Sequence, residues 1–406
     1  MTTASENALL AKAPWLNAPS SQRLMDVLTE GGIQARFIGG CVRDALLGDL
    51  DPEVDLDIAT PLLPDQVIKR LEGAGIKAIP TGIAHGTVTA LIDQRPFEIT
   101  TLRKDIDCDG RHALVEFTDD FRLDAERRDF TINTLSADRQ GRLFDDFGGL
   151  DDLEAGRVRF VGNASLRVRE DYLRILRFFR FFARFGKSPA DPLALKACLE
   201  GASGLAKISG ERIRSEMLKL LDSQEPIEAL TLMINYQVLS RILPVDVDLA
   251  PLDRLIKTAP KSEPLLRLAA LLRSSSTPKT AVLAIAAWKF SNAERTRLER
   301  IVLEPLFSLP LVKSEARKTI YRLGQDLFLD ILKLSAKTTD DLKAALPLPE
   351  AGRFPLTGQD LIDRQMQPGP ALGEQLKQLE QWWLDNDQKP DREACLQELE
   401  KRLANP

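Results

Sequence analysis

Residues 39–44 read GGCVRD, and residues 54–58 read VDLDI. In a strand, residues two apart point to the same face, so Asp55 and Asp57 would lie on one side with apolar neighbours packed behind them. Two carboxylates that close repel each other, and a divalent cation with oxygen ligands, such as Mg²⁺, removes the conflict. A glycine pair lets the backbone approach a phosphate group. The two stretches predict a joint site for a metal ion and a phosphate; the alternatives are an ordinary turn and surface charges.

A third carboxylate stands on a nearby predicted strand. Glu98 alternates with Phe97 and Ile99, so its side chain would leave the opposite face from these apolar residues. It is our candidate for completing a metal site with Asp55 and Asp57. The alternative is an ordinary solvent-facing strand residue.

A second cluster, residues 127–133, reads RRDFTIN. Arginine guanidinium groups can clamp a triphosphate, because their donors match phosphate oxygens in pairs. A carboxylate or amide close by can hold ribose hydroxyls. The alternative is a capped helix start that happens to carry charges.

A third cluster, residues 170–174, reads EDYLR. On a helix, Asp171 and Arg174 would be neighbours. Cytosine and adenine each present an amino donor beside a ring-nitrogen acceptor, which an aspartate and an arginine could read together. Uracil and guanine present the reverse order, and a mismatch would leave polar groups unpaired. The alternative is a local ion pair on a basic helix.

Composition narrows the class of protein. The chain has 406 residues, which suggests two or three domains, and is 44% hydrophobic and 28% charged, as folded proteins commonly are. No stretch is apolar enough to span a bilayer, and the N-terminus does not resemble a secretory signal. The four cysteines are far apart, which favours free thiols in a reducing compartment, hence a cytoplasmic location. The two histidines, His85 and His112, are too few for a histidine-rich metal site.

The charge is unevenly distributed. The formal net charge is −5, yet residues 161–220 carry twelve lysines and arginines against six acids. A basic segment in an acidic chain fits local binding of a polyanion. The alternative is a solvated helix face.

The order of patterns predicts an α+β fold. We expect a helix over 20–30, strands over 35–38, 54–58, 86–92 and 97–101, helices ending near Leu47 and over 64–74, and a turn over 105–110. After Gly162 helical periodicity dominates, with one aromatic-rich helix over 169–185. We therefore expect a mixed α/β domain over residues 1–150, a helical segment over 151–235, and a helical remainder over 236–406.

The three clusters, in this order and spacing, resemble the class II tRNA CCA-adding nucleotidyltransferase/poly(A) polymerase family. Residues 105–111 are similar to its flexible loop, with Asp105 and Arg111 as the functional candidates, and residues 209–216, 357–361 and 368–373 are similar to later segments. The resemblance implies a polymerase-β-like head followed by an all-α neck, body and tail. The neck would read the base, and the body and tail would bind tRNA.

The same resemblance implies roles for individual residues. Asp55 and Asp57 would be catalytic and would bind Mg²⁺, together with Glu98. The nucleotide-binding residues would be Gly39, Gly40, Arg43, Arg128, Asp129, Asn133, Asp171, Arg174 and Arg177.

The expected activity is template-independent addition of CMP and AMP, from CTP and ATP, to the tRNA 3′ end by two-metal transfer. A long basic tail of the kind some bacterial poly(A) polymerases carry is missing, which favours CCA addition. The rivals are an A-adding enzyme or poly(A) polymerase, and a non-catalytic RNA-binding protein. We expect no membrane association and no obligatory protein partner.

Overall fold

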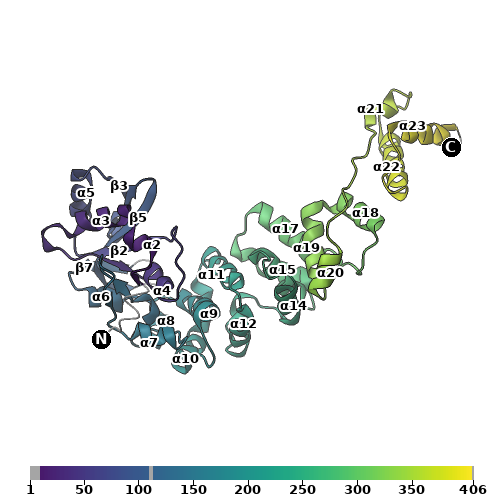
Figure 1. Ribbon diagram of the computed structural model, residues 1–406. Helices are drawn as coiled ribbons and strands as arrows, with labels where there is room; N and C mark the ends of the chain where they lie inside the picture. Colours follow the sequence, from purple (N-terminus) through teal and green to yellow (C-terminus); the bar gives the residue numbers. More distant parts are fainter. Residues whose placement is uncertain (1–9, 109–112, 405–406) are drawn as a thin grey trace. The chain divides into compact units, whose positions relative to one another are not determined.

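The computed structural model describes residues 10–108 and 113–404, without the side chains of residues 105–108, 113, 114 and 404. The chain divides into two compact units, Met1–Pro244 and Val245–Pro406, and Figure 1 traces the elements of both. This division falls near the boundary predicted at residue 235. The other predicted boundary, at residue 150, lies inside the first unit and stays a prediction.

The first unit contains a seven-stranded mixed sheet in the order β3-β4-β5-β2-β1-β8-β9. Only the β2–β5 pair is parallel among the described strands of this sheet, and it sets Asp57 beside Glu98. A two-stranded hairpin, β6–β7, lies beside it. The strands are β1 (Arg36–Ile38), β2 (Leu56–Thr60), β3 (Lys77–Gly82), β4 (Thr87–Ile92), β5 (Arg95–Thr101), β6 (Arg103–Cys108), β7 (Ala113–Phe117), β8 (Ser136–Ala137) and β9 (Leu143–Phe144).

The first unit also contains α-helices and short 3-10 helices, which carry the label η. They are α2 (Pro14–Asn17), α3 (Pro19–Thr29), η1 (Glu30–Gly32), α4 (Gly40–Leu46), α5 (Pro64–Gly73), η2 (Ile83–His85), α6 (Phe121–Glu126), η3 (Thr131–Asn133), α7 (Gly149–Glu154), α8 (Ala164–Glu170), α9 (Leu173–Phe185), α10 (Pro192–Gly201), η4 (Ala202–Lys207), α11 (Gly210–Asp222), α12 (Pro226–Asn235) and α13 (Leu239–Ile242). Helix α4 packs on β1 and β2, and α5 packs on β3 and β4. The predicted α+β class is confirmed.

Three predicted elements need correction. The strand predicted over 54–58 is β2, which begins only at Leu56, where pairing with β5 begins. The turn predicted over 105–110 is wrong for residues 105–108, which pair with β7; the pairing of two segments does not show in local turn composition. Residues 109–112 lie outside the described part of the chain. The single helix predicted over 169–185 is broken, since Asp171 has extended backbone angles (φ −151°, ψ 107°) and separates α8 from α9.

An aromatic cluster joins the sheet domain to α9. Phe130, which precedes η3, lies 4.8 Å from Phe160 and 5.2 Å from Phe181 between ring centroids. Phe178 stacks against Phe160 at 6.0 Å. Because these rings are almost completely buried, α9 is fixed against the segment that carries residues 127–133.

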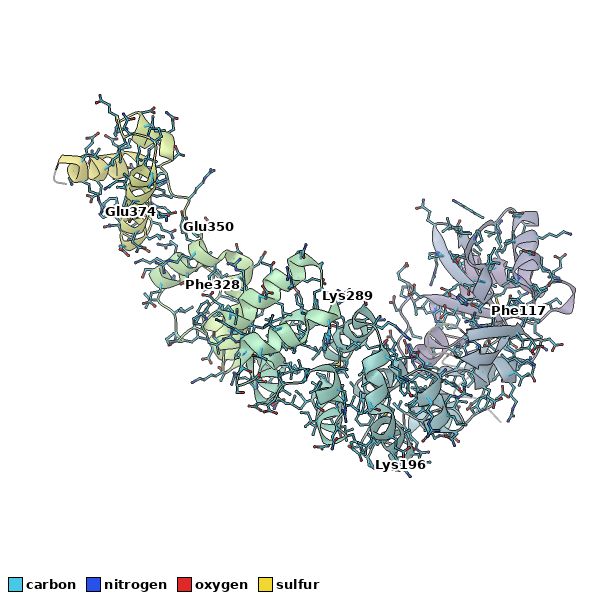
Figure 2. The ribbon with its side chains drawn as sticks, turned by 180° about the vertical axis from the view of Figure 1, so that it is seen from behind. Phe117, Lys196, Lys289, Phe328, Glu350 and Glu374 are labelled. Carbon is cyan, nitrogen blue, oxygen red and sulfur yellow. The ribbon has the colours of Figure 1, made fainter. Side chains whose placement is uncertain are left out.

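Every regular element among the described residues of the second unit is a helix, and Figure 2 draws the side chains of this unit, Phe328 among them. Its helices are α14 (Ala250–Thr258), α15 (Pro264–Arg273), α16 (Pro278–Ala284), η5 (Ala286–Trp288), α17 (Asn292–Leu303), α18 (Lys313–Leu323), α19 (Gln325–Ser335), α20 (Thr339–Ala344), α21 (Gly358–Ile362), α22 (Pro370–Asp385) and α23 (Arg392–Ala404). Phe328 and Leu332 centre one of its apolar clusters, and Trp383 and Leu379 another. No helix among the described residues is long and apolar enough to cross a membrane.

Candidate active site

A glycine bend forms the start of the site. Gly39 has φ +71°, a conformation that residues with a Cβ rarely adopt. Its N–H donates to the Leu135 carbonyl (3.1 Å), and its carbonyl accepts from the Arg43 N–H (3.0 Å), which begins α4. A Cβ at this position would lie 3.5 Å from an Nη atom of Arg128. The missing side chain at Gly39 therefore leaves room for the Arg128 guanidinium group beside the bend.

Carboxylates line the neighbouring strand ends. Asp57 on β2 faces solvent beside Glu98 on β5, and Asp55 precedes β2. Although Asp57 keeps an exposed face, crowding by protein atoms and the charges of Glu98 and Asp55 raise its pKa to about 6. Arg128 acts in the opposite direction. A carboxylate whose charge is disfavoured in this way is ready to accept a cation.

The predicted Mg²⁺ site can be compared with the carboxylates that the structure places there. Among the described residues, no three histidine, cysteine, aspartate or glutamate side chains form a group that could hold a metal ion. Asp55 and Asp57 nevertheless fit Mg²⁺, which commonly takes one or two protein carboxylates and completes its shell with water and substrate phosphates. Glu98 lies beside them but does not form a three-ligand group with them, so its role as a ligand stays a prediction.

The arginines that we predicted to bind phosphate donate hydrogen bonds to side chains of the protein itself. Arg128 donates to Asp124 (3.1 Å), and Arg127 donates to the same carboxylate (2.9 Å). Arg43 is buried, and it donates to Asp44 (2.8 Å) and to the Asn133 side-chain oxygen (2.6 Å). Thus Arg43 supports the wall of the site through Asn133, and any contact with a triphosphate would use its remaining surface.

Asp129 has several internal partners. One oxygen accepts from the Phe130 N–H and the Asn133 amide, both at 2.9 Å, and the other accepts from Arg177 at 2.7 Å. Burial alone would raise the pKa of Asp129, but Arg177 and these hydrogen bonds hold it below its usual value. The carboxylate is therefore ionised and fixed in orientation.

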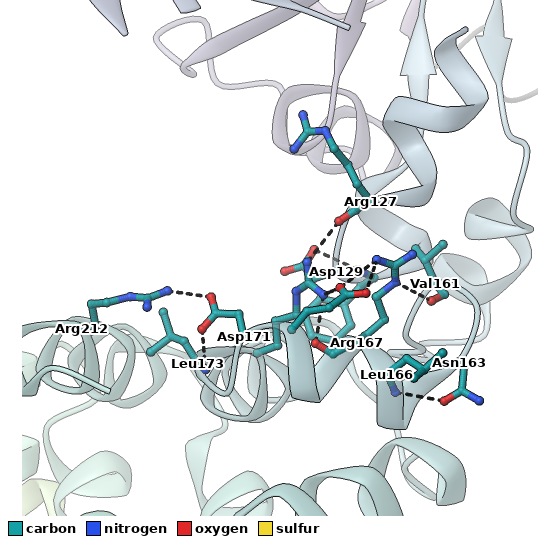
Figure 3. A network of polar contacts seen from close by, with 12 residues as sticks. Arg127, Asp129, Val161, Asn163, Leu166, Arg167, Asp171, Leu173 and Arg212 are labelled. Carbon is teal, nitrogen blue, oxygen red and sulfur yellow. Dashed lines mark hydrogen bonds and ion pairs between the residues drawn. The ribbon is translucent and has the colours of Figure 1, made fainter. Parts of the chain in front are cut away.

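The base-reading pair is arranged differently from the prediction. Asp171 accepts from the Leu173 N–H (3.0 Å) at the start of α9 and from Arg212 on α11 (2.7 Å), as Figure 3 shows. Arg174 instead donates to Glu170, to the Arg167 carbonyl (3.0 Å) and to the Arg127 carbonyl (3.2 Å). Asp171 and Arg174 thus do not form the local ion pair that was the alternative to base reading, because Asp171 lies at the break between α8 and α9 and pairs with α11.

One cavity of about 420 Å³ collects these groups. Six arginines and three aspartates line it, with two glycines, Asn133, Leu173 and Phe181: Gly39, Gly40, Arg43, Asp57, Arg127, Arg128, Asp129, Asn133, Asp171, Leu173, Arg174, Arg177, Phe181 and Arg212. All the predicted nucleotide-binding residues are in this set, as is Asp57, whereas Asp55 and Glu98 are not. The excess of positive charge, with one aspartate at the glycine bend and another at α9, suits a nucleoside triphosphate.

Some relevant residues were missed. The sequence places Arg212 in the basic segment and in the family-like segment 209–216 without giving it a role; its partner Asp171 is 41 residues away, so no local spacing could reveal the pair. Asp124, three residues before the RRDFTIN cluster, could have been found as the i, i+3 and i, i+4 partner of two arginines. The predicted loop residues cannot be placed: the Asp105 side chain and Arg111 lie outside the described residues.

The fold and the cavity belong to a nucleotidyltransferase of the poly(A) polymerase class, as the matching families show. Residues 35–159 match the family described as Poly A polymerase head domain. Residues 191–246 match "Probable RNA and SrmB- binding site of polymerase A", and residues 265–399 match tRNA nucleotidyltransferase domain 2.

Relatives that align over most of the chain identify the family within this class. The human CCA tRNA nucleotidyltransferase 1, mitochondrial, is 34% identical over 93% of this chain and 89% of its own length. A CCA-adding enzyme of Lactobacillus delbrueckii is 34% identical over 87% of this chain and 90% of its own. The crystal structure of the Bacillus stearothermophilus CCA-adding enzyme in complex with CTP superposes with a TM-score of 0.73 at 27% identity, covering 97% of this chain and all of that one. The chain belongs to the CCA-adding tRNA nucleotidyltransferase family.

Proposed function

We propose that this protein adds CMP and AMP to the 3′ end of tRNA, using CTP and ATP and no nucleic-acid template. The observation that carries the proposal is the composition of the 420 Å³ cavity, which places Asp57 and the glycine bend in one cavity with Asp171 and Arg174. Family membership narrows the reaction to CCA addition.

In this proposal, different residues of the cavity bind the phosphates, the ribose and the base. Arg128 and the backbone that follows the Gly39 bend would bind the triphosphate, because a guanidinium group and the N–H groups at the start of α4 donate to phosphate oxygens. Asn133 and the ionised Asp129 would orient the ribose. Asp171 would accept a hydrogen bond from the amino group of cytosine or adenine, and Arg174 would donate to the ring nitrogen.

Asp55 and Asp57 would hold the divalent cation that the family's chemistry implies, and Mg²⁺ fits these oxygen ligands. When bound, the ion would neutralise charge on the triphosphate and favour ionisation of the primer hydroxyl. We keep Glu98 as the proposed third carboxylate.

The test uses three tRNA transcripts: one lacking the CCA end, one lacking only the final A, and one complete. The proposal expects labelled CMP on the first, AMP on the first and second, and no further growth on the third. Absence of CMP incorporation would favour the A-adding reading, and unlimited AMP addition would favour poly(A) synthesis. Binding without any incorporation would favour a non-catalytic RNA-binding protein.

We further propose a cytoplasmic location. The three described cysteines are free thiols, which suits a reducing compartment. The human relative is described as mitochondrial, so cell fractionation with a mitochondrial marker decides between the two compartments.

A further inference from the structure

A buried carboxylate behind the arginines has no assigned task. Asp124 lies in the first turn of α6, and its side chain is 4% exposed. One oxygen accepts from Arg127 (2.9 Å) and from the backbone N–H of Arg103 (3.3 Å), and the other accepts from Arg128 (3.1 Å). Asp124 does not line the cavity, whereas both arginines do.

The geometry ties three parts of the first unit to one side chain. Arg103 begins β6, the first strand of the hairpin. Arg128 reaches the Gly39 bend, where an Nη atom lies 3.5 Å from the position of an ideal Cβ. A long arginine side chain loses considerable rotamer freedom when it is fixed in one place. Because Asp124 already fixes one edge of each guanidinium, that ordering takes place when the protein folds and not when the nucleotide binds.

We propose that Asp124 is a positioning residue for the triphosphate: it holds Arg127 and Arg128 in the orientation that binds the β- and γ-phosphates, and it connects them to the base of the β6–β7 hairpin. It touches no substrate. This inference rests on the proposed function, since it requires the cavity to bind nucleoside triphosphates.

The proposal predicts a particular pattern of affinities. Asp124→Asn keeps the size of the side chain but removes the charge that holds both arginines. We expect it to weaken CTP and ATP binding by about tenfold, the loss expected for one charge-assisted hydrogen bond. Binding of CMP should change little, because CMP lacks the β- and γ-phosphates. The choice of CTP over UTP should also be unchanged, since Asp171 is untouched.

The experiment measures CTP and CMP binding by calorimetry, together with KM and kcat for CMP addition, in wild type and Asp124→Asn. The matched control is Asp330→Asn, which also breaks a buried aspartate–arginine pair (Asp330 with Arg297, 2.9 Å), in the second unit. The control should lower the melting temperature and leave the ratio of CTP to CMP affinity as in wild type.

One outcome overturns the proposal: an unchanged ratio of CTP to CMP affinity in Asp124→Asn, either because neither nucleotide loses affinity or because both lose it equally. If Asp124→Asn does not fold, Asp124→Glu carries the test, because glutamate keeps the charge but its longer side chain displaces the carboxylate from both arginines; it should lower the same ratio. The proposed function fails separately, if the wild-type protein adds no CMP to tRNA at all.

Discussion

At the residue scale, the carboxylates of the cavity differ in how firmly they are held. Asp129 has an arginine, an amide and a backbone N–H as partners, whereas Asp57 is crowded by Glu98 and Asp55. The first arrangement stabilises the folded protein, and the second disfavours it until a cation is bound. The partners of Asp129 therefore suit a carboxylate of fixed orientation, and the surroundings of Asp57 suit the proposed metal ligand.

Asp129→Asn should destabilise the first unit by about 1.5–3 kcal/mol at pH 7, because it removes the charge-assisted hydrogen bond from Arg177, whose part-exposed guanidinium keeps Glu216 within 4.0 Å. The pKa of Asp129 is lowered in the folded protein. Its contribution is therefore present above its ordinary pKa, near 4, and is lost as the pH falls through the lowered folded value. Urea unfolding of wild type and variant at pH 7 and at successively lower pH checks this. A difference in unfolding free energy that does not shrink on acidification would contradict it.

Arg174→Ala should relax the choice of CTP and ATP over UTP and GTP by about tenfold, because one base-directed donor is lost. Competition assays with labelled nucleotides measure the selectivity. Since Arg174 also contacts Glu170 and the Arg127 carbonyl, a structural role is the rival. That role predicts a lower rate with selectivity intact.

At the element scale, Phe130 shows how the sheet domain and α9 are held together. Its side chain is fully buried and contacts Phe160 and Phe181. Phe130→Ala should cost about 3–5 kcal/mol, the usual range for deletion of a buried aromatic ring. The loss should appear in the unfolding transition that CTP shifts, because the cavity belongs to the same unit. An unchanged transition would mean that the ring cluster does not support the site.

The helices and strands also show which parts of the fold could be predicted from the sequence. Short segments with one clear period, such as β1, β4 and α5, were predicted close to their observed bounds. The break at Asp171 was not, because residues 169–185 keep helical spacing throughout and the partner of Asp171 at the break, Arg212, is 41 residues away. Likewise, pairing places residues 105–108 in a strand that their composition does not predict. Local pattern predicts elements, but contacts between distant segments decide their ends.

At the scale of the whole molecule, the basic segment over residues 161–220 has more than one role. Arg167, Arg177, Arg180 and Arg212 are engaged in ion pairs within the first unit. Lys196, Lys207 and Lys219 are exposed. Part of the charge therefore lines the cavity and part faces solvent, and local binding of a polyanion stays a prediction.

Replacing Lys196, Lys207 and Lys219 together by alanine should weaken tRNA binding and flatten its dependence on salt. Each phosphate contact that is lost lowers the log–log slope by roughly 0.7 to 0.9. The KM for CTP should stay within about twofold, because none of the three lines the cavity. Filter binding over a salt series provides the measurement, and an unchanged slope would place the tRNA-binding surface elsewhere.

The central claim is that Asp57 on β2, which lines the same cavity as Gly39 and Gly40, supports nucleotide transfer to tRNA. The most direct measurement is CMP incorporation into a tRNA transcript lacking CCA, by wild type and Asp57→Asn, with tRNA binding followed in parallel. We predict that the variant binds tRNA like wild type and loses about a thousandfold or more in rate, because several kcal/mol of charge stabilisation disappear. Turnover at the wild-type rate in Asp57→Asn would contradict the account.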